Sequence, residues 1–222
     1  MLKIRNLYHE YKDGSKKKVV LNDIDCDFEN GKIYAIMGPS GSGKTTLLSI
    51  ISGLDNPLKG EIYLDDKKVD DKNLLDYRKI DISIVFQAYN LIDYMTGLEN
   101  VVTAMEISGD TKNKVNIAKN VLNSLEIVGE NINRPVNTLS GGEAQRVAIA
   151  RSIAVNSKII FADEPTGNLD ENTEKEIIDI FKNLAHNKNK CVIIVTHSKE
   201  VANNADVIYI LKDKKLVKKL QV

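Results

Sequence analysis

Residues 38–45 read Gly38-Pro39-Ser40-Gly41-Ser42-Gly43-Lys44-Thr45, directly after the compact apolar run Lys32–Met37. The run is typical of a buried strand, and a helical pattern begins at Lys44. The octet matches the phosphate-binding pattern G-x-x-x-x-G-K-[ST] and stands between a strand and a helix, as that motif requires. Its glycines let successive backbone N–H groups point at one anion, and the helix start adds to the attraction. The sequence therefore predicts a phosphate site in which Lys44 reaches the β- and γ-phosphates and Thr45 offers a hydroxyl to Mg²⁺.

Two acidic residues, Asp163 and Glu164, follow a later apolar run, Ile159–Ala162. A buried strand carries Asp163 to the carboxyl edge of the sheet, where α/β folds bind their ligands. There Asp163 can hold Mg²⁺ directly or through a coordinated water, and Glu164 can polarise an attacking water. Taken alone, such a pair is as often a helix cap or a solvated turn. The phosphate loop upstream favours the metal-and-water interpretation.

A second glycine-containing helix start lies at Leu139-Ser140-Gly141-Gly142-Glu143. Ser140 is a suitable N-cap residue, and the two glycines expose backbone N–H groups beside it. Glu143, three residues after Ser140, would also complete an ordinary capping box, but capping does not require the glycine pair. We therefore predict a second anion-binding helix start. The two starts could serve one nucleotide or face each other across a dimer, and their spacing alone does not decide between these arrangements.

The rest of the chain alternates strand-like and helix-like patterns. The apolar runs Lys158–Ala162 and Cys191–Val195 are separated by a helical pattern over Thr173–Ala185, which predicts a largely parallel α/β sheet with right-handed crossovers. Further expectations are short strands before residue 36 and over 58–70, a hairpin-type turn at Glu29-Asn30-Gly31, helical structure over 88–157 that includes Val115–Leu125 and Ala144–Ile153, and two strands around the turn Lys212-Asp213-Lys214.

Composition is that of a globular domain. The 222 residues are 42% hydrophobic and 28% charged, with 31 basic and 31 acidic side chains, so the net charge of zero argues against broad nucleic-acid binding. No apolar run approaches the roughly 20 residues of a membrane helix, and the N-terminus is expected to begin a strand. Cys26 and Cys191 are expected to be buried free thiols rather than a disulfide. The lysine runs at residues 16–18 and near the C-terminus are expected to be solvated.

Together these motifs resemble those of the ABC transporter ATPases, over essentially the whole chain. Leu139-Ser140-Gly141-Gly142 resembles the signature motif of that family. Four further elements occur in the family's order: Gln87 matches the Q-loop glutamine, Gly167-Asn168-Leu169-Asp170 resembles the D-loop, His197 matches the switch histidine, and Tyr11 stands where an aromatic ring stacks on adenine.

The resemblance implies a fold and a domain organisation. We expect an α/β phosphate-loop NTPase core with a mainly parallel sheet, an N-terminal antiparallel β subdomain and an inserted α-helical subdomain. All 222 residues would form one ABC ATPase domain, in which about 1–87 and 158–222 form the catalytic core with its β subdomain and about 88–157 form the helical subdomain with the signature motif.

The resemblance also implies an ATPase that uses ATP and Mg²⁺. Two subunits would clamp two ATP molecules head-to-tail, with Glu164 as general base or water-positioning residue and His197 in contact with the γ-phosphate. Lys44 and Gln87 would assist catalysis. In this arrangement Tyr11, Gly38, Ser40, Gly41, Ser42, Gly43, Lys44, Thr45 and Thr46 of one chain bind the nucleotide, Thr45, Gln87 and Asp163 serve the metal, and Ser140, Gly141 and Gly142 face it from the other chain.

The subgroup most similar in sequence is that of the lipoprotein-releasing and macrolide-export ATPases. The similarity lies in Ala162–Asp170, Leu139–Glu143, Phe86–Leu91 and Glu99–Val101. Antimicrobial-peptide-resistance ATPases and cell-division ATPases, which regulate a membrane partner without transport, are the alternatives. Such subunits pair with an integral membrane permease-like protein and a second copy of themselves, so we expect a cytoplasmic protein, peripheral on the inner face of the cell membrane, with no nucleic-acid partner.

Two features depart from the family pattern or allow more than one interpretation. Glu143 and Ala144 stand where many members of the family carry glutamine, which bears on the dimer contact. The segment Tyr89–Met95 can be ordinary core or a docking surface, and the resemblance favours docking. A soluble ABC protein acting on DNA or ribosomes, and a phosphate-loop kinase, are weaker alternatives. The first generally needs an insertion or a second ATPase unit, and the second would lack the motif from Leu139 to Gly142.

Overall fold

Apolar runs rich in β-branched residues form the centre of the larger sheet. In the computed structural model, which describes residues 1–14, 16–109 and 112–219, strand β8 (Cys191–Val195) lies between β3 (Ile33–Met37) and β7 (Ile159–Asp163), and all three are parallel. The six-stranded sheet has the order β10-β9-β3-β8-β7-β6, with only β10 antiparallel to its neighbour. The predicted parallel α/β sheet is confirmed. Its strands are almost continuously apolar because both faces of such a sheet are covered.

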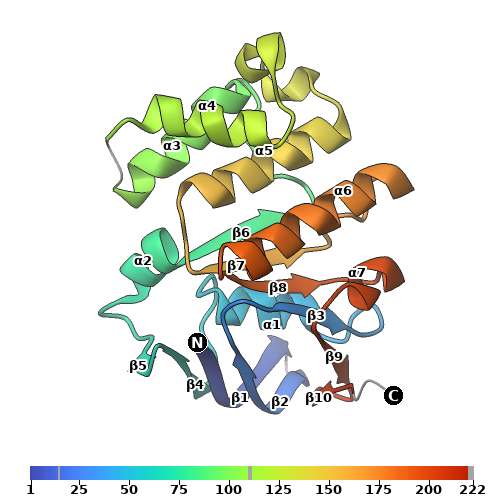
Figure 1. Ribbon diagram of the computed structural model, residues 1–222. Coiled ribbons are helices and arrows are strands. Elements are labelled where there is room, and N and C mark those ends of the chain that lie inside the picture. Colours follow the sequence, from blue (N-terminus) through green and yellow to red (C-terminus); the bar gives the residue numbers. More distant parts are fainter. Residues whose placement is uncertain (15, 110–111, 220–222) are drawn as a thin grey trace.

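Two hydrophobic clusters cover the two faces of this sheet. On one face, helix α1 (Lys44–Ile51) packs between the parallel sheet and a four-stranded antiparallel sheet of order β2-β1-β4-β5 (Figure 1). On the other face lie the helices α3, α5, α6 and α7, with α4 packed outside them. Alternation along β7 shows this division, since Ile159 and Phe161 belong to the first cluster while Ile160 and Ala162 belong to the second.

The remaining elements complete the expected antiparallel β and helical regions. Among the strands they are β1 (Leu2–Asp13), β2 (Lys16–Phe28), β4 (Lys59–Leu64), β5 (Lys67–Lys68), β6 (Ile82–Phe86), β9 (Val207–Lys212) and β10 (Lys215–Lys218). Among the helices they are α2 (Leu74–Asp76), α3 (Gly97–Ser108), α4 (Lys114–Ser124), α5 (Gly141–Ala154), α6 (Glu171–Lys182) and α7 (Lys199–Asn203).

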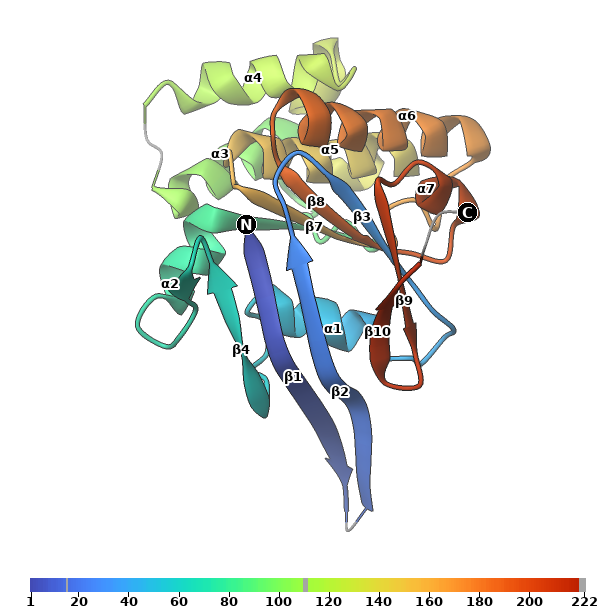
Figure 2. The same cartoon turned by 60° about the horizontal axis from the view of Figure 1, so that its bottom comes forward.

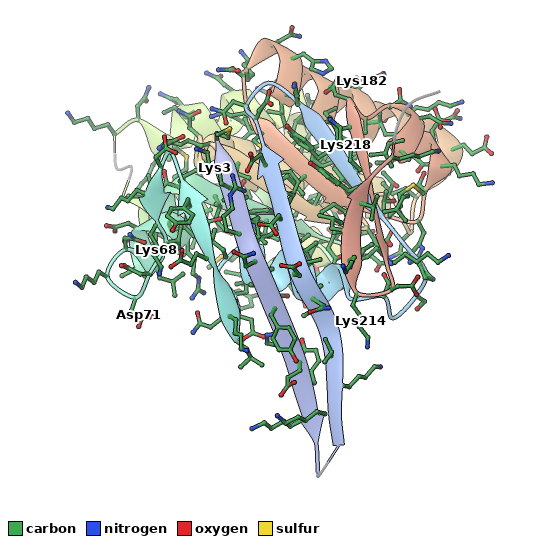
Figure 3. The ribbon with its side chains drawn as sticks, turned by 90° about the horizontal axis from the view of Figure 1, so that it is seen from below. Lys3, Lys68, Asp71, Lys182, Lys214 and Lys218 are labelled. Carbon is green, nitrogen blue, oxygen red and sulfur yellow. The ribbon has the colours of Figure 1, made fainter. Side chains whose placement is uncertain are left out.

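Strands β1 and β2 form a long ribbon whose far end extends away from the rest of the molecule (Figure 2). The outer side of the β region carries many charged side chains, among which Lys3, Lys68, Lys214 and Lys218 are visible in Figure 3. Tyr11 lies near the tip of the ribbon, two residues before the end of β1, and forms, as described below, one wall of the candidate site. The two strands thus connect the antiparallel sheet with the site region.

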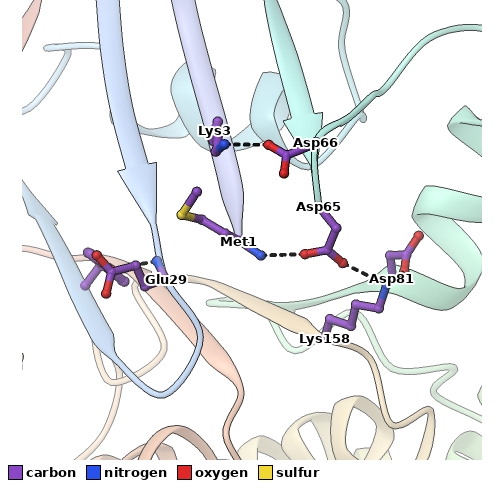
Figure 4. Close-up of polar contacts among 8 residues, drawn as sticks. Met1, Lys3, Glu29, Asp65, Asp66, Asp81 and Lys158 are labelled. Atoms are coloured by element: carbon purple, nitrogen blue, oxygen red, sulfur yellow. Dashed lines mark hydrogen bonds and ion pairs between the residues drawn. The ribbon is translucent and has the colours of Figure 1, made fainter.

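A chain of ion pairs joins the two sheets at the end opposite the ribbon tip (Figure 4). The N-terminal ammonium of Met1 lies 2.6 Å from Asp65 Oδ1, and Lys158 Nζ lies 3.1 Å from both Asp65 Oδ2 and Asp81 Oδ1. Met1 directly precedes β1 and Asp65 directly follows β4, both in the four-stranded sheet, whereas Asp81 and Lys158 directly precede β6 and β7. Each exposed pair contributes little by itself, but together they fix the junction of the two sheets.

Three expectations about local structure were wrong. Residues 88–96 are not helical, because the helical pattern starts only at the Thr96–Glu99 capping box of α3. Glu29-Asn30-Gly31 is not a hairpin turn, since β2 pairs in the four-stranded sheet whereas β3 pairs in the six-stranded one. Residues 16–18 belong to strand β2 and not to the loop expected there, although Lys17 and Lys18 are exposed.

Several smaller expectations are confirmed. β9 and β10 form the predicted pair of strands around a turn, with Asp213 and Lys214 both at positive φ. Cys26 and Cys191 are buried free thiols, and burial raises the pKa of both. Within the described ranges, the helices are all too short or too polar to cross a membrane.

Candidate functional site

The first turn of α1 presents backbone donors without a side-chain cap. Gly43 is the N-cap residue, with φ of 103° and no capping hydrogen bond. A side chain at this position would be strained, and its Cβ would lie 2.5 Å from Cγ1 of Val20. Over the described part of the chain, the N–H groups of Lys44, Thr45 and Thr46 have no acceptor. These are the donors that an anion binds at a helix start.

A cavity of about 620 Å³ opens over this helix start. It has the size of an ordinary small-molecule site, and the polar groups gathered in it come from both sheets. Most of the residues predicted from sequence lie together here: the cavity is lined by Tyr11, Lys18, Val20, Ser40, Gly41, Gly43, Lys44, Thr45, Thr46, Gln87, Asp163, Glu164, Gly167 and His197.

Two of the loop residues predicted to bind the nucleotide, Gly38 and Ser42, do not line the cavity. Gly38 contributes its carbonyl oxygen, which accepts a hydrogen bond from Lys44 Nζ at 3.0 Å. A Cβ on Gly38 would come within 2.4 Å of the Leu211 carbonyl oxygen, so the loop can approach β9 only with glycine there. The Ser42 hydroxyl is buried and finds no partner among the described residues, while its N–H donates to Pro39.

Lys44 connects the loop with the ends of the parallel strands. Its ammonium group lies 3.0 Å from His197 Nε2, and because an ammonium can only donate, His197 accepts through Nε2. Glu164 accepts a hydrogen bond from the His197 backbone N–H at 3.0 Å and places Oε1 3.4 Å from His197 Nε2. Burial lowers the pKa of Lys44, and the nearby carboxylates of Glu164 and Asp163 oppose that shift. The three side chains therefore form one connected polar group.

Asp163 lies at the carboxyl end of β7, as predicted, and next to Thr45. Burial raises the pKa of Asp163, the charge of Glu164 adds to this, and a hydrogen bond with Thr45 opposes it. A raised carboxyl pKa beside a second acid and a hydroxyl is the electrostatic setting that a hard cation relieves. The oxygen donors of Asp163 and Thr45 thus fit Mg²⁺.

The backbone at Glu164 is unusual. Its φ is 46°, in the left-handed region that costs about 1 kcal/mol or more for a residue with a side chain. Hydrogen bonds from Glu164 N to the Val195 carbonyl oxygen and from Gly167 N to the Glu164 carbonyl oxygen hold it there. The left-handed backbone turns the chain at Glu164, so that its carboxylate lies at the carboxyl end of the sheet, beside His197.

The β1–β2 ribbon forms the opposite wall. The Tyr11 hydroxyl lies 3.2 Å from Thr46 Oγ1, and 46% of Tyr11 is exposed, so its ring is available for stacking. Lys18 is the cross-strand partner of Tyr11 and lies on the same side of the ribbon. Lys17 instead forms an ion pair with Glu10 at 3.2 Å and does not line the cavity. Lys18 was missed by sequence reasoning, because only the register with Tyr11 reveals its position.

Gln87 lies just after β6, at the edge of the cavity beside Gly167. A methyl group on Gly167 would come within 3.0 Å of the Gln87 side-chain nitrogen. The Q-loop and D-loop residues therefore meet in this structure. Gly167 itself lines the cavity, although sequence reasoning did not place it among the site residues.

The second glycine-containing helix start lies elsewhere. Ser140 caps α5, and none of Ser140, Gly141 and Gly142, all within the described ranges, lines the cavity. Ser140 Oγ donates to Glu143 Oε2 at 2.8 Å and accepts from Glu143 N at 3.3 Å, while Ser140 N donates to Glu143 Oε2 at 2.8 Å. The capping box is present, Gly141 is exposed and Gly142 is half-buried, in a place separate from the first helix start.

The segment after Gln87 divides between core and surface. Leu91 is partly buried against the helical core, whereas 79% of Tyr94 is exposed. Tyr89 and Asn90 both have positive φ, and their carbonyl oxygens accept hydrogen bonds from Arg151. Only part of the segment is therefore free to contact another protein.

A second hollow, of about 450 Å³, lies between β6, α3 and α5. Leu75 and Ile107 are large apolar side chains on its rim, 67% and 61% exposed. Arg78, Lys79 and Arg151 add positive charge. An apolar rim of this kind, with cations beside it, is typical of a protein-contact surface.

Comparison with known proteins places these features in a family. The ABC transporter family model matches residues 21–167. An uncharacterized ABC transporter ATP-binding protein of Bacillus subtilis, YclH, is 47% identical over 208 residues, which cover 93% of this chain and 91% of that protein. The lipoprotein-releasing system ATP-binding protein LolD of Rickettsia bellii is 38% identical over 213 residues, with 96% and 95% covered.

A solved structure shows the same architecture. It is the ATP-binding cassette MJ0796, of Methanocaldococcus jannaschii, in a dimeric post-hydrolysis state bound to ADP and Pi. The match has a TM-score of 0.90 at 38% sequence identity and covers 99% of this chain and 98% of the other. The expected fold is thereby confirmed.

Proposed function

The chain belongs to the ABC transporter family, and from this membership we propose that it is the ATP-hydrolysing subunit that powers a separate membrane protein. One observation carries the proposal. The cavity gathers Tyr11, the phosphate loop, Asp163 and Glu164, while the helix start at Ser140 with its two glycines lies outside it. One chain thus contains two complementary parts of an ATP site rather than one complete site.

ATP binding follows from the cavity. We propose that Tyr11 stacks on adenine, that the free N–H groups at the start of α1 hold the phosphates, and that Lys44 neutralises the β- and γ-phosphates. His197 already contacts Lys44 and would approach the γ-phosphate from the end of β8. MJ0796, a relative with the same fold, is described as bound to ADP and Pi, which supports this use of the cavity.

We propose that Thr45, Asp163 and Gln87 hold Mg²⁺ at the phosphates. When bound, the ion would neutralise charge on the phosphate oxygens and help align them for attack by water. Thr45, Asp163 and Gln87 all line the same cavity, and Gln87 follows Phe86, the cross-strand neighbour of Asp163. The ion would thereby offset the burial and the negative charge of Glu164 that raise the pKa of Asp163.

Hydrolysis is assigned to Glu164 and His197. The Glu164 carboxylate is fixed by its strained backbone and by the His197 N–H, and we propose that it orients the attacking water and accepts its proton. His197 and Lys44 stabilise the charge on the γ-phosphate as the bond to the leaving group breaks. The oxygen of the water becomes bonded to the γ-phosphorus, the bond to the β-phosphate oxygen breaks, and ADP and inorganic phosphate are released.

The signature motif is proposed to act in trans. Ser140, Gly141 and Gly142 would meet the γ-phosphate of ATP held by a second copy of the chain, and two such contacts would close a symmetric homodimer. The relative MJ0796 is described as dimeric, which supports this arrangement. The domain division proposed from sequence, with the core at about 1–87 and 158–222 and the helical part at about 88–157, would let the signature helix move with the helical part.

The membrane partner is proposed to dock on the hollow between β6, α3 and α5, with Leu75 and Ile107 as contacts, and to extend to the exposed Tyr94 before the start of α3. Arg151 lines this hollow and binds the carbonyl oxygens of Tyr89 and Asn90, which follow Gln87. Movement of Gln87 on ATP hydrolysis would therefore be transmitted to the docked membrane partner. The protein would then be cytoplasmic and peripheral on the inner face of the membrane. The similarity to LolD favours export or lipoprotein release, with peptide resistance or a cell-division role as alternatives.

The proposal is tested by phosphate release from the purified chain with ATP and Mg²⁺. The parental chain should release phosphate, and Glu164→Gln, which preserves shape but removes the carboxylate, should bind ATP and release almost none. A Glu164→Gln chain with parental turnover would contradict the assignment of Glu164 and the mechanism built on it.

A further inference from the structure

The hydroxyl proton of Ser140 is already used within the chain. Ser140 Oγ donates it to Glu143 Oε2 at 2.8 Å, and the same carboxylate oxygen accepts the Ser140 N–H, also at 2.8 Å. A serine hydroxyl has one proton to donate. Ser140 can therefore donate to a phosphate oxygen only after its hydroxyl turns away from Glu143.

The Glu143 carboxylate is also fixed in place and charged. Asn131 Nδ2 donates to Glu143 Oε1 at 2.7 Å, so both carboxylate oxygens are held. The hydrogen bonds from Ser140 lower the pKa of Glu143, so the group is ionised at neutral pH. Among the described residues no cation forms an ion pair with Glu143. Arg146 pairs with Glu176 at 2.9 Å and Arg134 donates to Asn131 and Thr138, but both arginines are near enough to help lower the pKa of Glu143. A negative charge, offset only in part by these arginines, thus stands beside the two glycine N–H groups.

We propose that Glu143 restrains ATP-dependent dimerisation, by occupying the Ser140 hydroxyl and by repelling the γ-phosphate that the partner chain presents. This inference rests on the proposed function, because it assumes that the signature helix start meets ATP in trans. Glu143 is a positioning residue here, since it acts through Ser140 and through its charge. The chain carries an acid where its family often carries a neutral glutamine, so the restraint would be set by this one side chain.

Helix capping alone does not account for the acid. Gln completes a capping box as Glu does, so Glu143→Gln should keep α5 capped and change little except the charge. A structural role for Glu143 therefore predicts that Glu143→Gln leaves the dimer unchanged or weakens it. The restraint predicts the opposite, a tighter dimer.

The chain supplies a matched control in α3. Thr96 and Glu99 form the same capping box, with Thr96 N donating to Glu99 Oε2 at 2.8 Å and Glu99 N donating to Thr96 Oγ1 at 3.1 Å. No glycine pair follows Thr96 as it follows Ser140, and neither Thr96 nor Glu99 belongs to the proposed nucleotide site. Glu99→Gln thus makes the same chemical change at a helix start that meets no nucleotide.

The size of the effect follows from charge and symmetry. Removing a repulsion between solvent-exposed charges changes an interaction about twofold to fivefold. A two-fold symmetric dimer contains two copies of the contact, so the changes multiply to roughly 4- to 25-fold in the dimer dissociation constant.

The experiment measures dimer dissociation by sedimentation velocity at saturating ATP and Mg²⁺, in chains that all carry Glu164→Gln so that the nucleotide persists. We compare Glu164→Gln alone with the same chain carrying Glu143→Gln or Glu99→Gln. The first addition should tighten the dimer by the factor above, and the second should leave it unchanged. The gain should shrink when salt is raised from about 0.1 M to about 1 M, since the Debye length falls from about 10 Å to about 3 Å.

The outcomes separate the two claims. If Glu143→Gln leaves the dimer unchanged or weaker, or if Glu99→Gln tightens it equally, the restraint is overturned while the proposed function stands. If Glu164→Gln stays monomeric with ATP both alone and with Glu143→Gln added, the proposed dimer fails and the role of Glu143 fails with it. Unchanged ATP affinity of the monomer and unchanged helix content by circular dichroism show that each variant is folded.

Discussion

The two glycine-containing helix starts of this protein differ in whether a side chain caps their backbone N–H groups and in the charge beside them. The start of α1 has Gly43 as its N-cap, no side-chain cap, and a cation beside its free N–H groups. The start of α5 has Ser140 as its N-cap, a complete capping box, and the anion Glu143 beside its free N–H groups. The first lies in a cavity with Asp163 and Glu164, and the second lies outside it, with Ser140 and Gly141 exposed.

The difference teaches which helix start can act alone. An anion bound at α1 meets unused donors and a positive charge, so a single chain can bind ATP. An anion bound at α5 must displace a hydrogen bond and approach a negative charge, so that contact needs the support of a whole interface. We therefore propose that the two starts are complementary halves, one that binds the nucleotide and one that closes a dimer.

The largest effect is expected at α1. Lys44→Ala removes the cation, and loss of hydrogen bonds to a charged group should weaken ATP binding roughly 10- to 100-fold. Equilibrium binding of a fluorescent ATP analogue measures this. Lys17→Ala, which removes an equal charge on the other side of the ribbon, is the control. Unchanged binding by the Lys44→Ala chain would mean that the α1 start is not the phosphate site.

A smaller effect, of a different kind, is expected at α5. Ser140→Ala and Thr96→Ala each remove an N-cap, so each should lower the free energy of unfolding by about 1 kcal/mol. Only Ser140→Ala should weaken the ATP-dependent dimer of the Glu164→Gln chain, by roughly tenfold, while ATP binding by the monomer stays intact. Denaturant unfolding and sedimentation measure the two effects. If both variants weaken the dimer equally, capping rather than nucleotide contact explains the role of Ser140.

The smallest effect sharpens the α1 half. Lys18→Met should weaken ATP and ADP binding about twofold to fivefold, because an exposed ammonium on the cavity wall attracts the phosphates weakly. Lys17→Met should have no effect, since Lys17 pairs with Glu10 away from the cavity. Calorimetric titration with each nucleotide checks the pair. Equal effects of the two changes would indicate general electrostatics rather than a wall contact.

Local patterns predicted the central sheet because its strands are short, apolar and bounded by turns. Ile33–Met37, Ile159–Asp163 and Cys191–Val195 all have this form. Strand β6 was missed because its edge position leaves Ser83, Ile84 and Phe86 only partly buried and its pattern is less uniform. Residues 88–96 were wrongly assigned to helix because apolar residues there pack on the helical core without forming a helix of their own.

The residues of the candidate site that could be predicted directly are those that form short contiguous motifs. The phosphate loop and the pair Asp163 and Glu164 are of this kind, and resemblance supplied the scattered Tyr11, Gln87 and His197. Sequence could not predict the contact of Lys18 with the cavity, because strand register decides it. Nor could it show that Ser140 and Lys44 lie in separate places, because that depends on how the helices pack.

The central claim is that one chain holds complementary halves of two ATP sites. Light scattering after gel filtration of Glu164→Gln, with and without ATP and Mg²⁺, tests it most directly. The account predicts a monomer with ADP or no nucleotide and a dimer, at twice the mass of one chain, with ATP. A folded Glu164→Gln chain that binds ATP but remains monomeric at every concentration would contradict it.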